Sequence, residues 1–418
     1  MIPLMRSAVY LSTILAVFSN SAMALEFGGW SELEGRVFPN DPLYEGQQQN
    51  SASAAIQPEF YQQWAGGSSF TFVPFYRYDS ADDQRTHFDI REAMWLWPKD
   101  RFELRAGIGK VFWGVTEANH LVDVINQTDL IESLGGEEKL GQPMVNLTLL
   151  TDQGTLGTLD VFILPYFRER IFPGRGGRLR FDPYIDTGDE VEYEDSAREG
   201  HVDYALRYGN TIGKLDVGVS HFYGTSREPA YLTEFDSNGV LSIIPFYEII
   251  NQTGLDIQYA GGAWLWKLEA IYRSGNDDGS FYATDAGFEY TFSGAGLGGM
   301  DLGLIVEYLY DSRDFDVDTA TLIASGYIGS QFNTFLNNDY MVGLRLALND
   351  EASSEILTGF IQDIDNHASV FQLEAGRRIG DSWKAELDAY IFIDASKDPL
   401  LDFLRKDSFV QLALKYYF

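Results

Sequence analysis

Residues 410–418 read VQLALKYYF, and their pattern decides the fold. The even positions, from Val410 through Tyr416 to Phe418, carry only apolar or aromatic side chains, whereas the odd positions carry Gln, Ala, Lys and Tyr. Successive side chains of a β-strand point to opposite faces of the sheet. The stretch is therefore expected to be a strand with one apolar face and one polar face.

The same two-residue alternation recurs along the chain in segments of about ten residues, near the length that a tilted strand needs to cross a bilayer. Clear examples are residues 264–273, 285–292, 301–310, 340–348 and 383–393. A soluble β-sandwich also alternates, but its strands are usually shorter. The pattern thus favours an all-β fold, a transmembrane antiparallel up-and-down β-barrel.

The connections between these segments alternate between short and long, as they do in membrane barrels. Short turns include Gly66-Gly67, Pro98-Lys99, Gly261-Gly262 and Gly380-Asp381. Long connections fall at residues 39–53, 113–141, 169–198, 225–247, 313–337 and 395–406. The count is about eighteen strands with both ends on the periplasmic side. Sixteen is the alternative, because the segments 54–64, which contains Pro58, and 157–168 are weak.

The beginning of the chain has the features of an export signal. Arg6 supplies a positive charge, Val9–Phe18 supplies a short apolar stretch, and Ala22-Met23-Ala24 supplies a cleavage pattern before Leu25. Residues 1–24 are expected to be a signal peptide, and residues 25–418 a single barrel domain. No apolar run after Leu25 is long enough for a transmembrane helix.

Composition excludes several classes of function. The net charge of −32 argues against a nucleic-acid partner. The chain has no cysteine, which excludes disulfides, thiolate metal sites and cysteine nucleophiles. Its five histidines form no HxH or HxxxH pair, so neither a zinc site nor any other cofactor is expected.

The connection 113–141 differs from the other long connections because it is partly apolar. Leu121, Val122, Val124, Ile125 and Leu130 would be awkward on an exposed loop. We expect this third external loop to fold into the lumen and bury these side chains against the barrel wall. Thr116 or Thr128 is expected to cap a short helix there.

If the loop enters the lumen, its polar residues become candidates to line a constriction: Glu117, His120, Asp123 and Asp129. Positions expected to face them from the wall carry Arg77, Arg91 and Arg105. A basic ladder opposite an acidic loop makes a transverse field that sets charge selectivity. The alternative is that the arginines pair with neighbours such as Asp89 and Glu103 and only neutralise the lumen.

With these residues in view, the chain resembles a Gram-negative outer-membrane porin over its whole mature length, by architecture rather than by a tight motif. Phe418, preceded by Tyr416 at the alternate position, resembles the carboxy-terminal signal that the barrel-assembly machinery reads. The place of the third loop resembles the porin eyelet loop. Residues 109–114 and 122–126 are more distantly similar to an uncharacterised proteobacterial family of outer-membrane barrels.

The resemblance implies a passive diffusion channel in the bacterial outer membrane for small hydrophilic or anionic and carboxylate solutes. It implies contact with lipid and lipopolysaccharide, no enzymatic activity, and a homotrimer, although no surface in the sequence can be read as an interface. Two alternatives stay open. The apolar third loop also suits a plugged barrel for uptake or export of hydrophobic ligands, and some outer-membrane hydrolases are built on barrels.

Overall fold

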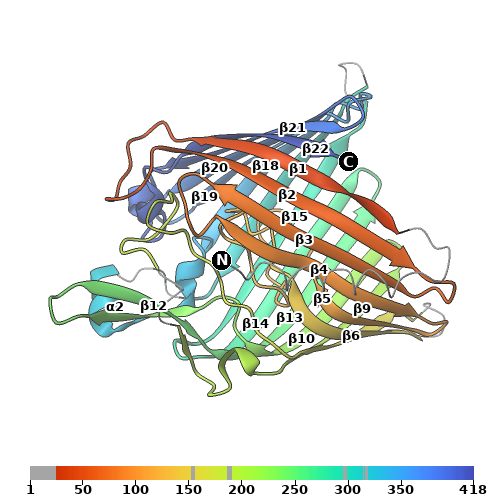
Figure 1. Ribbon diagram of the computed structural model, residues 1–418, viewed down its shortest axis with the longest axis horizontal. Coiled ribbons are helices and arrows are strands. Elements are labelled where there is room, and N and C mark those ends of the chain that lie inside the picture. Colours follow the sequence, from red (N-terminus) through yellow and green to blue (C-terminus); the bar gives the residue numbers. More distant parts are fainter. Residues whose placement is uncertain (1–24, 152–155, 186–190, 295–298, 314, 316–318) are drawn as a thin grey trace, which may run out of the picture.

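Eighteen strands close into one antiparallel barrel in the computed structural model, which describes residues 25–151, 156–185, 191–294, 299–313, 315 and 319–418 (Figure 1). The expected signal peptide, residues 1–24, lies outside the described residues. The barrel strands are β1 (Glu26–Val37), β2 (Asn50–Gln63), β3 (Ser69–Asp79), β4 (His87–Pro98), β5 (Phe102–Gly109), β6 (Gln142–Leu150), β7 (Thr158–Leu164), β9 (Asp203–Ile212), β10 (Leu215–Thr225), β13 (Ile249–Gly261), β14 (Trp264–Asn276), β15 (Gly279–Phe292), β16 (Asp301–Asp311), β18 (Asn338–Ala347), β19 (Glu355–Asp363), β20 (Ser369–Ile379), β21 (Trp383–Ile393) and β22 (Phe409–Tyr417).

The first and last strands close the wall. β1 pairs with β2 on one side and with β22 on the other, in a register that runs from Trp30 opposite Tyr417 to Val37 opposite Val410. Polar side chains join this seam as well. Lys415 Nζ lies 3.3 Å from a carboxylate oxygen of Glu32, and Arg36 Nε donates to Gln411 Oε1 at 2.6 Å. Closure leaves no strand edge without a partner.

Burial along the strands is the inverse of that in a soluble protein. In β14, Trp266 and Tyr272 are exposed on the outer face, whereas Glu269 and Arg273 are buried on the inner face. Apolar side chains on the outside and polar ones on the inside suit a wall between lipid and water. The expected transmembrane β-barrel is therefore confirmed. No helix among the described residues is long and apolar enough to cross a membrane.

Both weak segments are strands, β2 and β7, so the count of eighteen holds. Pro58 has no N–H to donate. The β2–β3 register pairs Ile56 with Tyr76 and resumes at Phe60 with Phe72, so Pro58 lies where that ladder is interrupted. A proline is tolerated in a strand where no ladder hydrogen bond is required of it.

The long connections at one end of the barrel fold together, which the sequence pattern did not predict. They form a second sheet in the order β17 (Tyr327–Ile328), β11 (Ala230–Phe235), β12 (Leu241–Tyr247) and β8 (Glu192–Tyr193). The helical turns are α2 (Thr319–Ser325), η2 (Arg198–Gly200), η3 (Ser330–Asn333), η4 (Ala395–Lys397) and η5 (Leu401–Leu404). α2 and β12 project beyond the barrel on the left of Figure 1.

We call this assembly of connections the outer cap. Its buried apolar core consists of Phe172, Ile185, Tyr231, Ile328 and Phe332, and Leu130 of the connection between β5 and β6 packs against that core. The outer cap and this connection are therefore in direct contact.

Candidate functional site

The connection between β5 and β6, residues 110–141, is pinned at its base by one side chain. The Asn126 amide donates to the carbonyl oxygens of Gly109 and Leu140, at 2.9 and 2.8 Å, and its oxygen accepts from the Val111 N–H. The expected short helix is wrong, because residues 110–141 are described throughout and contain none. Thr116 and Thr128 are therefore not helix caps; Thr128 instead forms an isolated β-bridge with Lys139.

The apolar residues of this segment are buried, as their composition suggested. Val122, Val124 and Ile125 join a cluster with inner side chains of β4, β6, β7, β9, β10, β13, β14 and β15. Burying them removes apolar surface that would be costly to leave in water. The apolar part of the segment thus packs against side chains of these eight strands.

Two wall carboxylates hold the beginning of the segment. Glu269 on β14 accepts from the backbone N–H groups of Val115, at 2.6 Å, and of Thr116, at 3.0 Å. Glu307 on β16 accepts from the N–H groups of Glu117 and Ala118, each at 2.8 Å. Such charge-assisted hydrogen bonds are roughly twice as strong as neutral ones. They fix where this part of the segment lies along the wall.

The alternation in residues 264–273 and 301–310 puts Glu269 and Glu307 on the polar faces of their strands, but it indicates no role for them. A usable signal was present, since ionisable residues inside membrane segments are costly and often functional. What the sequence lacks is the identity of their partners, which depends on the path of a long connection.

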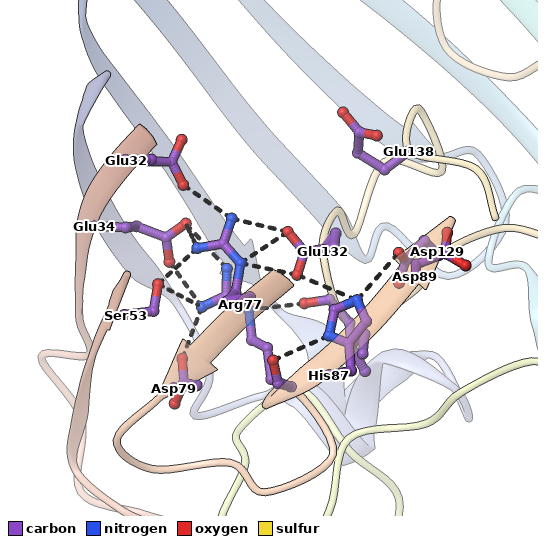
Figure 2. Close-up of polar contacts among 12 residues, drawn as sticks. Glu32, Glu34, Ser53, Arg77, Asp79, His87, Asp89, Asp129, Glu132 and Glu138 are labelled. Atoms are coloured by element: carbon purple, nitrogen blue, oxygen red, sulfur yellow. Dashed lines mark hydrogen bonds and ion pairs between the residues drawn. The ribbon is translucent and has the colours of Figure 1, made fainter. Parts of the chain in front are cut away.

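Arg77 on β3 joins the wall to the segment (Figure 2). Its guanidinium lies 2.9 Å from Glu32 and 3.3 Å from Glu34, both on β1, and 2.8 Å from Glu132 of the segment. Arg85, from the connection between β3 and β4, adds contacts to Glu34 at 2.9 Å and to Asp79 at 2.7 Å. All these side chains are almost completely buried, so this ion-pair network is shielded from solvent.

Arg91 on β4 makes the second link between wall and segment. It lies 2.6 Å from Asp129 and 3.1 Å from Asp89. Burial would raise the pKa of Asp129, but His87 and Arg91 outweigh it and hold that pKa below its ordinary value. The structure therefore brings Arg77 and Arg91 together with the acidic segment, directly as ion pairs rather than across open water.

Arg105 does not meet the segment. Its side chain is 48% exposed and its partner is Glu103, at 2.5 Å. That pairing is the neutralising alternative considered for the sequence. The three arginines thus do not form one ladder along the segment.

The other residues expected at a constriction have separate partners. Glu117 lies 2.8 Å from Arg345 on β18 and 3.4 Å from Lys267 on β14. Asp123 pairs with Lys139 at 3.1 Å within the segment, and burial raises its pKa despite this lysine.

His120 is the most exposed of these residues. Its Nδ1 lies 3.9 Å from a carboxylate oxygen of Glu269, and this nearby carboxylate raises the pKa of His120.

The space beside the segment is a cavity of about 380 Å³. Residues 132–138 of the segment line it on one side, and inner side chains of β1 to β4 and β18 to β22 line it on the other. The apolar half of the segment packs on the opposite part of the wall. A second cavity, of about 230 Å³, lies between the segment, the outer cap and two parts of the wall, β14 to β16 and β19 to β21. Within the described residues, no cluster of three or more His, Asp or Glu side chains is arranged to hold a metal ion.

Comparison with models of protein families and with curated sequences found no match. Solved structures that resemble the chain include engineered variants of the porin from Rhodopseudomonas blastica. Two of them share 10% sequence identity, cover 94% of this chain and 100% of their own, and give TM-scores of 0.44 and 0.42. A third, titled "Asymmetric conductivity of engineered proteins", has the same identity and coverage and a TM-score of 0.43. Likenesses this distant bear on neither solute nor oligomeric state.

Asp285 on β15 is an unpaired carboxylate in the middle of the inner wall. It lies opposite Glu269 in the β14–β15 register, it is fully buried, and neither of its oxygens has a hydrogen-bond partner among the described residues. Burying a charge without a partner costs free energy that the fold must supply elsewhere. Asp285 is therefore a local source of instability.

Replacing Asp285 with Asn is expected to raise the free energy of unfolding by about 1–3 kcal/mol, because it keeps the shape and removes a carboxyl group whose ionised form has no partner. Urea titration of the protein in detergent micelles, followed by gel mobility, measures the change. Asp365→Asn, in an exposed turn, is the matched control and should leave the midpoint unchanged. A lower midpoint for Asp285→Asn would show that the carboxylate is stabilising.

Proposed function

We propose that the protein is a passive diffusion channel in the outer membrane of a Gram-negative bacterium, and that it carries small hydrophilic solutes. The observation that carries the proposal is the cavity of about 380 Å³ lined mostly by charged side chains within a closed wall. The cavity is lined by polar side chains and the outer face of the barrel is apolar, which is the arrangement of an aqueous pore in lipid. The protein would act without chemistry or a cofactor.

We propose further that residues 110–141 lie in the lumen and form its constriction. In support, the segment contacts inner side chains on many strands: it packs on β4 and on β6 to β15, and its carboxylates reach Arg77 on β3 and Arg345 on β18. Glu117, Asp123, Asp129 and His120 would lie at or behind the narrowest point. Arg105 would lie away from it.

A ladder of arginines free to attract anions would favour the expected anionic or carboxylate solutes. Arg77 and Arg91 are buried in ion pairs, so little of their charge is available to a solute. We therefore retain small hydrophilic solutes in the proposal and treat the sign of selectivity separately below.

One observation favours the plugged alternative. The segment contributes to an apolar cluster that spans eight wall strands, and the outer cap packs against it through Leu130. If these contacts close the lumen, the barrel would release or take up ligands only after a rearrangement. No cluster within the described ranges favours the hydrolase alternative.

Purified protein inserted into planar lipid bilayers is expected to give stepwise, ohmic increases in conductance, because a water-filled path would cross the wall beside the segment. Heat-unfolded protein at the same detergent concentration is the control. A folded barrel that inserts but conducts nothing would contradict the channel and support the plugged form.

Membrane lipid, lipopolysaccharide, the barrel-assembly machinery and two further copies of the chain are the partners we propose. Tyr416 and Phe418 stand at the closing seam, with the Phe418 N–H bonded to the Gly29 carbonyl at 3.1 Å and its ring 5.6 Å from that of Phe27. Their role as an assembly signal stays a prediction.

A further inference from the structure

The larger cavity is lined by more carboxylates than cationic side chains, and the two kinds differ in how many of them form ion pairs. Nine carboxylates and six cationic side chains face this space. All six cations are held in ion pairs; Lys415, for example, lies 2.7 Å from Glu386 and 3.3 Å from Glu32. The cationic side chains of the lining are therefore neutralised by carboxylates of the wall and of the segment.

Three of the carboxylates form no ion pair with any residue that the structure describes: Glu137 of the segment, Glu374 on β20 and Asp388 on β21. Glu374 and Asp388 lie directly opposite each other in the β20–β21 register. Like charges in that arrangement destabilise a sheet. Their hydrogen-bond donors are neutral amides, and Gln411 donates to Asp388 at 2.9 Å.

Glu137 faces the same cavity from the segment. A side chain at the nearby Gly135 would come within 3.4 Å of the hydroxyl of Tyr390, which is on β21. The segment thus approaches the wall at the strand that carries Asp388. The unpaired carboxylates belong to both sides of one confined space, and no cationic side chain among the described residues forms an ion pair with them.

We propose that this opening passes cations in preference to anions, and that Glu137, Glu374 and Asp388 set the preference. The inference rests on the proposed channel function. Unpaired negative charge beside confined water concentrates mobile cations and excludes anions, because field lines are focused by the low-dielectric wall. Rings of carboxylates act in this way in cation channels.

The arginines expected to select anions cannot balance this effect. Arg77 and Arg91 also border the cavity, but each is nearly inaccessible to solvent and contacts at least two carboxylates. A mobile ion would meet the pair rather than the bare guanidinium. The net electrostatic potential in the opening is therefore negative.

The test is a reversal potential measured across a steep KCl gradient in planar bilayers. The unmodified protein should give the sign of a potassium-preferring pore. The triple variant Glu137→Gln, Glu374→Gln, Asp388→Asn should lower the ratio of potassium to chloride permeability several-fold. Glu137→Gln alone, in the segment and outside the strands, should give part of that shift even if the strand substitutions impair folding.

A matched control neutralises three exposed acidic residues on short turns: Asp100→Asn, Glu351→Gln and Asp381→Asn. It removes the same charge from the protein but not from the cavity, so the permeability ratio should not change. If the protein conducts but prefers anions or shows no preference, the inferred cation preference is wrong and the proposed channel function still holds. A triple variant with unaltered selectivity rules out the three carboxylates. A protein without conductance contradicts the channel itself.

Discussion

Replacing residues 116–139 with a short glycine–serine linker is expected to raise single-channel conductance several-fold. Residues 132–134, 137 and 138 of the segment line one side of the larger cavity, and other residues of the segment line the smaller one. Without it, the water-filled cross-section would extend toward β6–β15, and ionic current rises with that cross-section. Single-channel recording in planar bilayers measures the change.

The barrel should survive this replacement. Gly109 at the end of β5 lies opposite Gln142 at the start of β6, so a short linker is long enough to join the two strands. The matched control shortens the β11–β12 hairpin at residues 236–239, in the outer cap, and should leave conductance unchanged. If the linker variant conducts like the unmodified protein, residues 116–139 do not constrict the pore.

Arg77→Met is expected to lower the free energy of unfolding by about 3 kcal/mol, near the lower end of the cost of removing one partner from a buried ion pair. Glu32, Glu34 and Glu132 would lose their shared guanidinium while staying buried. Glu34 retains Arg85, and Glu32 retains Lys415, which limits the loss. Urea titration of the micelle-bound protein measures it.

The comparison for this variant is Arg105→Met, which removes a half-exposed arginine with one partner. Exposed ion pairs contribute about 0–1 kcal/mol, so the Arg105 variant should unfold close to the unmodified protein. Adding Glu132→Gln to Arg77→Met should restore part of the lost stability, because it removes one of the stranded charges. Equal costs for the two arginine variants would contradict the buried network.

The barrel was predictable because each strand carries its own signal. Alternation in β14 or β22 places every side chain on the lipid or the water side without knowledge of any other strand. Even β2 was recoverable despite Pro58, since one missing N–H interrupts the ladder without ending the strand. Local patterns therefore determine the number of strands and the face of each residue.

The site was only partly predictable because its contacts join distant segments. The acidic, apolar character of residues 113–141 indicated a segment that packs inside, and the inner positions of Arg77 and Arg91 followed from alternation. Glu132 as the partner of Arg77, and Glu269 as the anchor of Thr116, depend on how a long connection folds. The outer cap was missed for the same reason. Strands β11 and β12 are six and seven residues long, and they belong to the separate sheet rather than to the barrel wall.

The seam between β1 and β22 borders the larger cavity. Pairing these two strands therefore closes the barrel and, at the same time, brings together charged side chains that line this cavity. Glu32 and Arg36 lie on the first barrel strand, β1, whereas Lys415 and Gln411 lie on the last, β22. Until these strands meet, each of those polar groups lacks the partner that the other strand supplies. A barrel in which β1 and β22 stayed apart would thus lack these polar contacts and would also leave two strand edges unpaired. Both losses favour the fully closed barrel.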